Sequence, residues 1–471
     1  MQWSAVTFLL RHIARERMHL IGDNMTMHAI DPAITRKTSA RIAQDRATVI
    51  ARNAASSCGI RAAAHNPQAA SLASTTFDVQ LKQGDITNQK RSGRCWMFAS
   101  LNTMRYRIIK KLGIKTFELS QAYPLFWDKY ERANWFFENI IVTANQDLAG
   151  REASFLLADP LCDGGQWDMF RSLVKKYGVC PKEAMPETAN SSNTRDLDKY
   201  LTRYLRACAK KLREAVAAGQ TTEELQATKD KMLSDVYRAL VICLGEPPAS
   251  FDVRIRDEKG ELKASGTYTP QEFFREYVDM DLDSYISIIN APTPDKPYYR
   301  SYTVKYLGNV AEDGGVRYVN LPIESLKRVA VAQMRDGLPV WFGSDVDQGF
   351  DSERGLLDPA SIDVDALFGL PIEAGLNKGD RLQYGESLMT HAMTLQGVSL
   401  DAAGEPTSWR IENSWGEDHG HEGYDIGSAA WFDEYVYQVV VDKKYLTPEE
   451  LTAFESDPIE LAPWDPMGSL A

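Results

Sequence analysis

A cysteine stands where a loop gives way to a helix, and this junction constrains the chain more than any other feature. Residues 84–94 (GDITNQKRSGR) have loop composition, with Gly84 and Gly93 as breaks. The run that begins at Cys95 repeats apolar residues at near-helical spacing as far as Gly113, which suits a helix C-terminus. The sequence therefore places the Cys95 thiol at the positive end of a helix dipole.

A cysteine in this position is suited to nucleophilic catalysis. A thiol attacks a carbonyl group only as a thiolate, and a neighbouring imidazolium lowers its pKa further. The chain has seven histidines, of which His391 opens a strand-like run, HAMTLQGVSL. The other six lie in the N-terminal stretch, in a helix or loop, or in a polar glycine-rich segment: His12, His19, His28, His65, His419 and His421. His391 is therefore the candidate partner of the thiol.

Three further side chains complete the set that a thiol peptidase needs. Asn413 lies in IENSWG, where its amide is placed to orient the His391 ring and Trp415 to shield that contact from water. Gln89 precedes Cys95 by six residues, and its amide N–H and the backbone N–H of the cysteine suit an oxyanion. Each feature alone also fits an ordinary structural residue, but their order predicts a catalytic set of cysteine, histidine and asparagine.

This order resembles the papain-type cysteine peptidases. Longer strings resemble one branch of them, the bleomycin hydrolase/aminopeptidase C family: ITNQKRSGRCWMFASLN, DGGQWDMF, MTHAMTLQGV, WRIENSWGEDHG and PWDPMGSLA. The resemblance runs from about Phe77 to Ala471 and implies a cysteine aminopeptidase that releases N-terminal residues from peptides. It also implies that amide-containing drugs such as bleomycin are possible substrates.

The resemblance further implies an architecture and an assembly. The expected fold is α+β, with a helical lobe and an antiparallel β lobe, extended by inserted helical and hook-like segments that build a homohexamer. Gly164 and Gly165 would let a substrate backbone approach closely. The C-terminal arm would enter the active site, where the carboxylate of Ala471 would face the substrate's α-ammonium group and limit cleavage to the N-terminus.

The expected division of the chain follows from these assignments. Residues 1–26 are an extension that resembles nothing else, either an amphipathic arm or an artefact of start-site choice. The remaining expected segments are 27–195 (N-terminal helices and helical lobe with Cys95), 196–335 (insertion), 336–455 (β-rich lobe with His391 and Asn413) and 456–471 (arm). Patterns predict a helical hairpin at 195–245 with a capping box at Thr221 and Glu224, a helix at 322–336 and a buried strand at 338–346.

Composition narrows the cellular setting and the partners. The formal charge is 53 − 65 = −12, which argues against general binding to nucleic acid or anionic membranes. No apolar run approaches the roughly 20 residues needed to cross a bilayer. The six cysteines are sparse, and no Cys/His spacing suggests a metal site. Cys162 would lack a disulfide partner, because Ser92 stands where secreted relatives usually carry a cysteine. We therefore expect a cytoplasmic protein without a cofactor.

Other functions use the same residue types. An endopeptidase would share the catalytic set, and a Cys/His acyltransferase would share the thiolate chemistry. Acyltransferases usually orient the histidine with an aspartate, so the NSWG string counts against that reading. A non-enzymatic assembly on this fold would be expected to lose a catalytic group, and all four are present.

Overall fold

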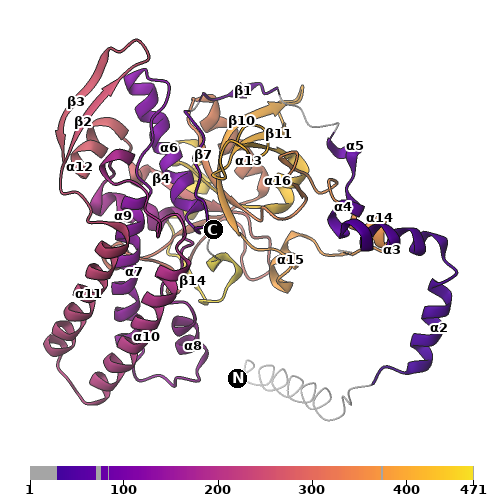
Figure 1. Ribbon diagram of the computed structural model, residues 1–471, viewed down its shortest axis with the longest axis horizontal. Helices are drawn as coiled ribbons and strands as arrows, with labels where there is room; N and C mark the ends of the chain where they lie inside the picture. The colour runs from indigo at the N-terminus through magenta and orange to yellow at the C-terminus, as the bar shows by residue number, and fades with distance from the viewer. Residues whose placement is uncertain (1–28, 71–75, 83, 373–374, 470–471) are drawn as a thin grey trace, which may run out of the picture. The chain divides into compact units, whose positions relative to one another are not determined.

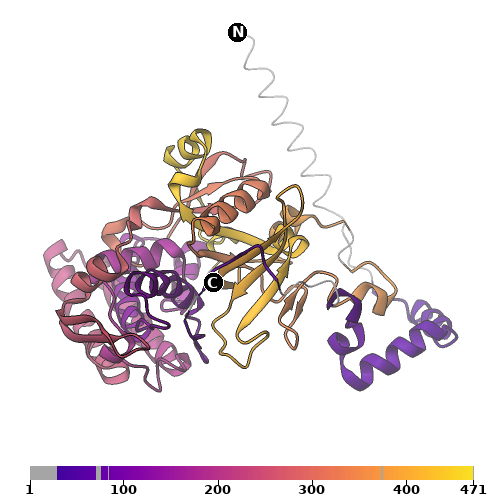
Figure 2. The ribbon, with the colours of Figure 1, turned by 90° about the horizontal axis from the view of Figure 1, so that it is seen from above.

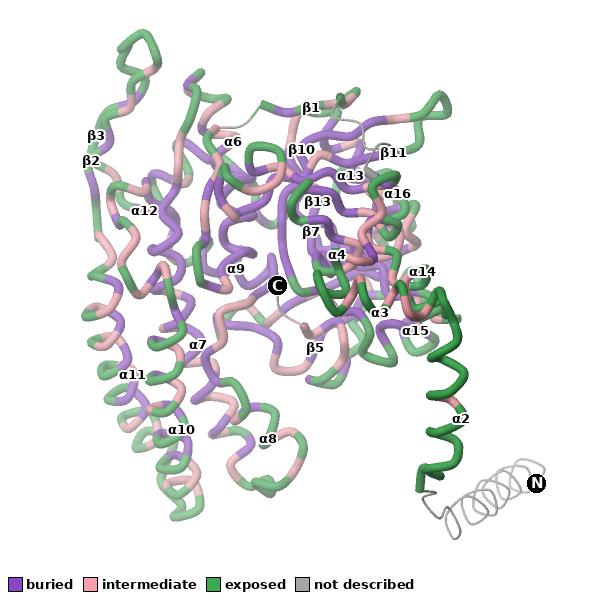
Figure 3. The backbone as a smooth tube through the Cα atoms, turned by 45° about the vertical axis from the view of Figure 1, so that its right-hand side comes forward, coloured by how far each residue is buried: buried purple, intermediate pink, exposed green. Residues whose placement is uncertain are grey.

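The chain forms two units in the computed structural model, which describes residues 29–70, 76–82, 84–372 and 375–469. The predicted extension 1–26 lies outside the described residues. The described part of the smaller unit holds α2 (Pro32–Ile42), α3 (Arg46–Cys58), α4 (Ile60–Ala64) and α14 (Val364–Phe368). Its helices are mostly exposed, as the green trace of α2 in Figure 3 shows. The larger unit carries the predicted catalytic residues and is described next.

A large mixed sheet organises the larger unit. The strand order is β14-β5-β6-β4-β13-β7-β10-β11-β12-β9-β8, and β1 also pairs with β10. The bounds are β1 Val79–Gln80, β4 Tyr285–Ile289, β5 Arg300–Val304, β6 Tyr318–Asn320, β7 Val340–Ser344, β8 Phe350–Asp351, β9 Leu356–Leu357, β10 His391–Leu400, β11 Pro406–Glu412, β12 Tyr424–Ser428, β13 Val436–Asp442 and β14 Ile459–Leu461. The predicted strand at 338–346 is β7, which lies between β13 and β10.

Most helices of this unit lie between β1 and β4 in the sequence, one precedes β1, and the others are interleaved with the later strands. The helices are α5 Pro67–Ala70, α6 Cys95–Leu112, α7 Ala122–Val142, α8 Arg151–Ala158, α9 Trp167–Tyr177, α10 Arg195–Ala217, α11 Thr222–Leu244, α12 Pro270–Phe273, α13 Ile323–Arg335, α15 Lys378–Tyr384, α16 Ala429–Tyr435 and α17 Pro448–Glu455. A hairpin of β2 (Phe251–Arg256) and β3 (Leu262–Tyr268) stands apart from the sheet. Figures 1 and 2 show helices α6 to α11 gathered on one side of the orange-to-yellow strands.

The α+β fold class is confirmed, as are the predicted hairpin and helix. The hairpin is α10 and α11, and Thr221 and Glu224 form the predicted capping box. The helix predicted at 322–336 is α13. Strands β2 to β6, which lie within 196–335, were not foreseen, because the insertion was expected to be helical and hook-like. The lobe boundaries themselves stay predictions.

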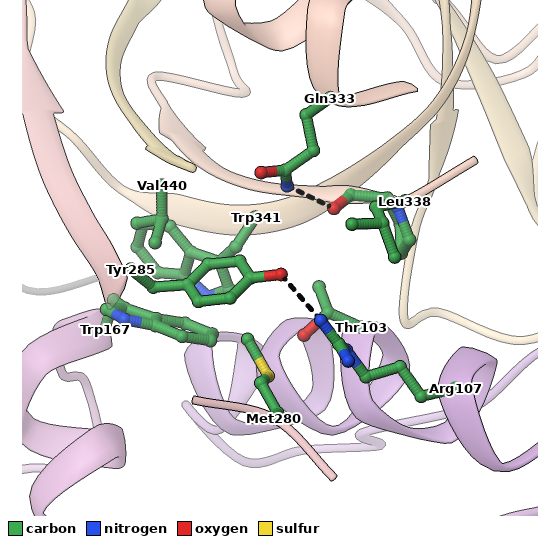
Figure 4. A pocket seen from close by; sticks show the side chains of 10 residues that line it. Thr103, Arg107, Trp167, Met280, Tyr285, Gln333, Leu338, Trp341 and Val440 are labelled. Atoms are coloured by element: carbon green, nitrogen blue, oxygen red, sulfur yellow. Dashed lines mark hydrogen bonds between the residues drawn. The ribbon is translucent and has the colours of Figure 1, made fainter. Parts of the chain in front are cut away.

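Helix α6 joins the two halves of the larger unit. It packs on β10 and β7, and the indole N–H of Trp341 in β7 donates to the Trp96 carbonyl oxygen at 3.2 Å. Figure 4 shows a small cavity at this seam, where Arg107 of α6 donates to the Tyr285 hydroxyl at 3.1 Å. The cavity holds only about 10 Å³, about enough for one water molecule. The helix that begins at Cys95 is therefore packed tightly against β10, the strand that begins at His391, and against its neighbour β7.

Candidate active site

Cys95 is the first residue of α6 and is 3% exposed. Arg94 stands at the N-cap, and its side chain does not cap the helix. Its guanidinium instead donates to both carboxylate oxygens of Glu187, at 2.9 and 2.8 Å. The Arg94 side chain therefore does not occupy the backbone N–H groups of the first helical turn. The junction between loop and helix lies at Cys95, as the sequence predicted.

The environment of Cys95 disfavours an isolated thiolate. Burial raises the pKa of the thiol to about 11, although hydrogen bonds from the backbone N–H groups of Ala392, Trp96 and Cys95 itself act in the opposite direction. Because Ala392 directly follows His391, the sulfur lies beside the start of β10. Because opposite charges stabilise each other strongly in a buried site, a thiolate here depends on a neighbouring imidazolium.

His391 is held on two sides. Its Nε2 lies 3.0 Å from Asn413 Oδ1, and its ring is stacked on Trp415 with the centroids 4.8 Å apart. Burial lowers the pKa of His391, whereas the hydrogen bond to Asn413 raises it. The structure thus brings together the histidine, asparagine and tryptophan that the sequence predicted, and it leaves Nδ1 as the ring nitrogen not bonded to Asn413.

Gln89 is fixed in the loop before the helix. Its Nε2 donates to the Ser92 carbonyl oxygen at 2.7 Å, and its Oε1 accepts from the Ser414 hydroxyl at 2.6 Å. An amide NH2 group has two hydrogens, so the bond to Ser92 leaves one for another acceptor. The Gln89 backbone N–H also donates to the Ser414 carbonyl oxygen at 2.8 Å. Since Ser414 follows Asn413 directly, these bonds tie the glutamine loop to the segment that orients His391.

Asp163 ties the glycine pair to the nucleophile loop. Its carboxylate accepts from the Gly93 N–H at 2.9 Å, and its carbonyl oxygen accepts from the Trp96 indole at 2.8 Å. Burial acts to raise the Asp163 pKa, but Lys129, 2.7 Å away, holds it below its usual range. A Cβ on Gly165 would lie 2.5 Å from the Trp96 ring, so the predicted glycine packs directly on the residue after Cys95.

The C-terminal segment runs to this same region. Strand β14 pairs in parallel with β5, and the chain continues to Ser469. The Ser469 carbonyl oxygen accepts from Gln166 Nε2 at 2.7 Å, and its hydroxyl donates to the Met389 carbonyl oxygen at 2.9 Å. These partners lie one residue after Gly165 and two before His391. The predicted carboxylate of Ala471 lies outside the described residues.

A cavity of about 480 Å³ lies beside the glycine pair and the arm. Its lining includes Gly164, Cys162 and Arg132 together with Gly468 and Pro463 of the arm, and much of the rest is apolar. Arg132 Nη1 donates to the Cys162 sulfur at 3.0 Å, and all six cysteines are free thiols.

Comparison with known proteins places this geometry in a family. The family model described as "Peptidase C1-like family" matches residues 29–468. The chain belongs to the Peptidase C1-like family. The membership confirms the class of enzyme that the sequence predicts, a cysteine peptidase related to papain.

Individual members of the Peptidase C1-like family are similar to this chain over most of its length. "Aminopeptidase C" of Streptococcus thermophilus is 51% identical over 395 residues, 84% of this chain and 88% of that protein. "Bleomycin hydrolase" of Homo sapiens is 45% identical over 392 residues, 82% of this chain and 86% of that protein. The crystal structure of PepW from Lactobacillus rhamnosis has a TM-score of 0.91 and 46% identity, and the match covers 94% of this chain and 99% of that one.

Sequence reasoning missed three polar residues at the site. Asp163, Asp425 and His419 contact predicted site residues or their loops, yet none was a candidate. His419 was set aside because its segment is polar and rich in glycine. A carboxylate directly before the glycine pair was the one available signal for Asp163.

Proposed function

We propose that the protein is a cysteine aminopeptidase that removes residues one at a time from the N-termini of peptides. The observation that carries the proposal is the meeting of the C-terminal segment, through Ser469, with residues beside both the glycine pair and His391. The names of the similar proteins support the same activity. "Bleomycin hydrolase" adds amide-containing drugs to the proposed substrates.

The proposed reaction is acyl transfer through a thioester. His391 takes the Cys95 proton, and the thiolate attacks the substrate carbonyl carbon. Gln89 and the Cys95 backbone N–H stabilise the resulting oxyanion. His391 then gives its proton to the leaving amine, and water, deprotonated by the same ring, releases the acyl group and restores the thiol.

Asn413 and Trp415 serve the histidine in this scheme. The asparagine aims the ring through the 3.0 Å bond to Nε2, so that Nδ1 exchanges the proton with sulfur. The stacked indole keeps water from that bond. Gly164, which lines the cavity, and Gly165 border the substrate backbone in this scheme. Gly165 also has a packing role, because a Cβ there would lie 2.5 Å from the Trp96 ring.

Selectivity for the N-terminus is assigned to the arm. An arm whose last described residue, Ser469, contacts Gln166 next to the glycine pair would occupy the space that residues preceding the scissile bond need in an endopeptidase substrate. The carboxylate of Ala471 would then pair with the α-ammonium group of the substrate. Longer peptides would bind only with their first residue next to Cys95.

A panel of aminoacyl fluorogenic amides, free and N-acetylated, tests the proposal. We expect free amides to be hydrolysed at least 100-fold faster than blocked ones, and Cys95→Ala to lose activity on both. Equal rates on free and blocked amides would favour an endopeptidase. Transfer of the acyl group to an added amine in preference to water would favour an acyltransferase.

A homohexamer in the cytoplasm completes the proposal. The described residues contain no helix that is long and apolar enough to cross a membrane. Sedimentation equilibrium is expected to give about six times the chain mass of 52.8 kDa. A monomer mass at micromolar protein would contradict the hexamer and leave the peptidase proposal standing.

A further inference from the structure

A buried carboxylate lies behind the asparagine that contacts His391. Asp425 belongs to β12 and is 0% exposed. Its Oδ2 accepts from Asn413 Nδ2 at 2.8 Å, and its Oδ1 lies 2.8 Å from His419 Nε2. A chain of hydrogen bonds therefore runs from His391 through Asn413 and Asp425 to His419.

This chain decides which way the Asn413 amide faces. A carboxylate only accepts hydrogen bonds, so the NH2 end of the amide must point to Asp425 and its oxygen to His391. The Ser414 backbone N–H, 2.8 Å from Asn413 Oδ1, favours the same orientation. Because the amide oxygen also only accepts, His391 must carry a proton on Nε2. Nδ1 is then the nitrogen that exchanges a proton with Cys95.

The surroundings of Asp425 leave its side chain little freedom. A Cβ on Gly355 would lie 3.0 Å from Oδ1 of Asp425, and one on Gly420 would lie 2.9 Å from it. His419 packs edge-on against the Trp415 ring, with centroids 4.8 Å apart. The ring that holds the carboxylate therefore also contacts the indole that is stacked on His391.

We propose that Asp425, held by His419, is a positioning residue that fixes the Asn413 amide and thereby the tautomer and charge of His391. The proposal rests on the cysteine peptidase function above and extends it by one step. Asp425 touches neither substrate nor the reacting atoms, so it acts only through Asn413 and its electric field.

The charged groups around His391 determine the direction in which Asp425 shifts the pKa of the ring. Burial lowers the pKa of the His391 ring most, whereas Asp425 and Asp347 raise it and His419 lowers it. The Cys95 thiolate would raise it as well. Removing the charge of Asp425 therefore lowers the His391 pKa, and the imidazolium that supports the thiolate is lost at lower pH.

The test compares wild type with Asp425→Asn, which keeps the shape and removes the charge. We expect kcat/KM on a free aminoacyl amide to fall by about 10-fold or more, mainly in kcat. In the pH profile of Cys95 alkylation by iodoacetate, an anion that the imidazolium attracts, the alkaline limb should move to lower pH. A variant with wild-type kcat and an unmoved alkaline limb would overturn the proposal.

A double-mutant cycle separates positioning from general damage. On an Asn413→Ala background, Asp425→Asn should lower kcat much less than it does in wild type, because its route of action is gone. Equal losses on both backgrounds would contradict action through Asn413. Glu412→Gln serves as the matched control, because this buried carboxylate binds Asn102 and Arg105 instead. It should lower stability without moving the alkaline limb.

Substitutions of His419 give a second test in which Asp425 itself is unchanged. His419→Gln keeps a donor for the carboxylate and should retain most of kcat, whereas His419→Leu should lose it. Equal kcat in the two variants would contradict the proposal that His419 holds the Asp425 carboxylate in position. Wild type that fails to hydrolyse amides while Cys95 still shows a two-limbed alkylation profile would refute the aminopeptidase function alone.

Discussion

Arg94 and Glu187 connect the nucleophile loop to the rest of the protein. The Arg94 side chain is fully buried, and its Nε also donates to the Ser92 hydroxyl at 2.8 Å. Ser92 in turn accepts from Gln89 through its carbonyl oxygen. One guanidinium therefore fixes the residue before Cys95 and the loop that carries the proposed oxyanion donor.

This pair predicts a pH-dependent contribution to stability. Burial acts to raise the pKa of Glu187, but Arg94 lowers it more, so the net value lies below 4.5. A group with a lowered pKa in the folded state contributes stability above its unfolded pKa and loses it as pH falls through the folded value. Glu187→Gln should cost about 2–3 kcal/mol at pH 7.

Urea unfolding at several pH values measures this difference. The gap between wild type and Glu187→Gln should be constant from pH 6 to 8 and should narrow below about pH 4.5. A gap that stays the same down to pH 3 would show that the carboxylate charge is not the cause.

Residues with one local signal were predictable, whereas residues that act through distant partners were not. Cys95, Gln89 and Asn413 each stand in a distinctive short string, and the structure brings them to one place. Asp163 and Asp425 lie in ordinary positions of a loop and a strand. Their importance comes from partners 70 and 12 residues away, and this separation leaves no local pattern.

The α10–α11 hairpin shows how far local rules reach at the level of elements. Thr221 Oγ1 accepts from the Glu224 N–H at 3.3 Å, and the Glu224 carboxylate accepts from the Thr221 N–H at 2.8 Å. These bonds satisfy two donors at the start of the helix. Thr221→Ala should therefore lower the free energy of unfolding by about 1 kcal/mol.

A threonine about two turns after Thr221 gives the control. Thr228 is partly exposed, and its hydroxyl donates to the Glu224 carbonyl oxygen within the helix. Thr228→Ala should leave stability unchanged or raise it slightly, because alanine has the higher helix propensity. Both variants should keep full peptidase activity. A larger loss from Thr228→Ala than from Thr221→Ala in thermal unfolding would contradict the capping argument.

The strands of the insertion illustrate the opposite case. β5 and β6 are short, and β6 holds only three residues, Tyr318–Asn320. They join the sheet through β4, whose other neighbour, β13, comes far later in the sequence. Such short strands gain their stability from pairing with strands that are distant in the sequence. Neither their length nor an alternating pattern therefore identified them.

At the scale of the whole molecule, the C-terminal arm reaches residues beside the proposed site. The arm is anchored before it arrives there, because Asp465 accepts from the buried Lys296 ammonium at 2.8 Å and Met467 is buried. Its final described residue, Ser469, then bonds to Gln166 and Met389. Removing the last residues should therefore open the site without unfolding the sheet.

Deletion of residues 468–471 tests this expectation. The truncated protein should hydrolyse N-acetylated amides at least about 10-fold faster than wild type does, while its thermal midpoint stays within a few degrees. If blocked substrates stay inert and free ones are still cleaved, the arm has no part in selectivity. Mass spectrometry of a digested 15-residue peptide should show internal cuts in place of single-residue removal.

The two hydrogen bonds of Ser469 also bear on how such a protein is purified. An affinity tag fused after Ala471 would begin two residues beyond Ser469, which is bonded to Gln166 and Met389. The added residues would displace the arm or crowd the approach to Cys95. Preparations tagged at that end are therefore expected to differ in substrate selectivity from those in which the tag has been cleaved away.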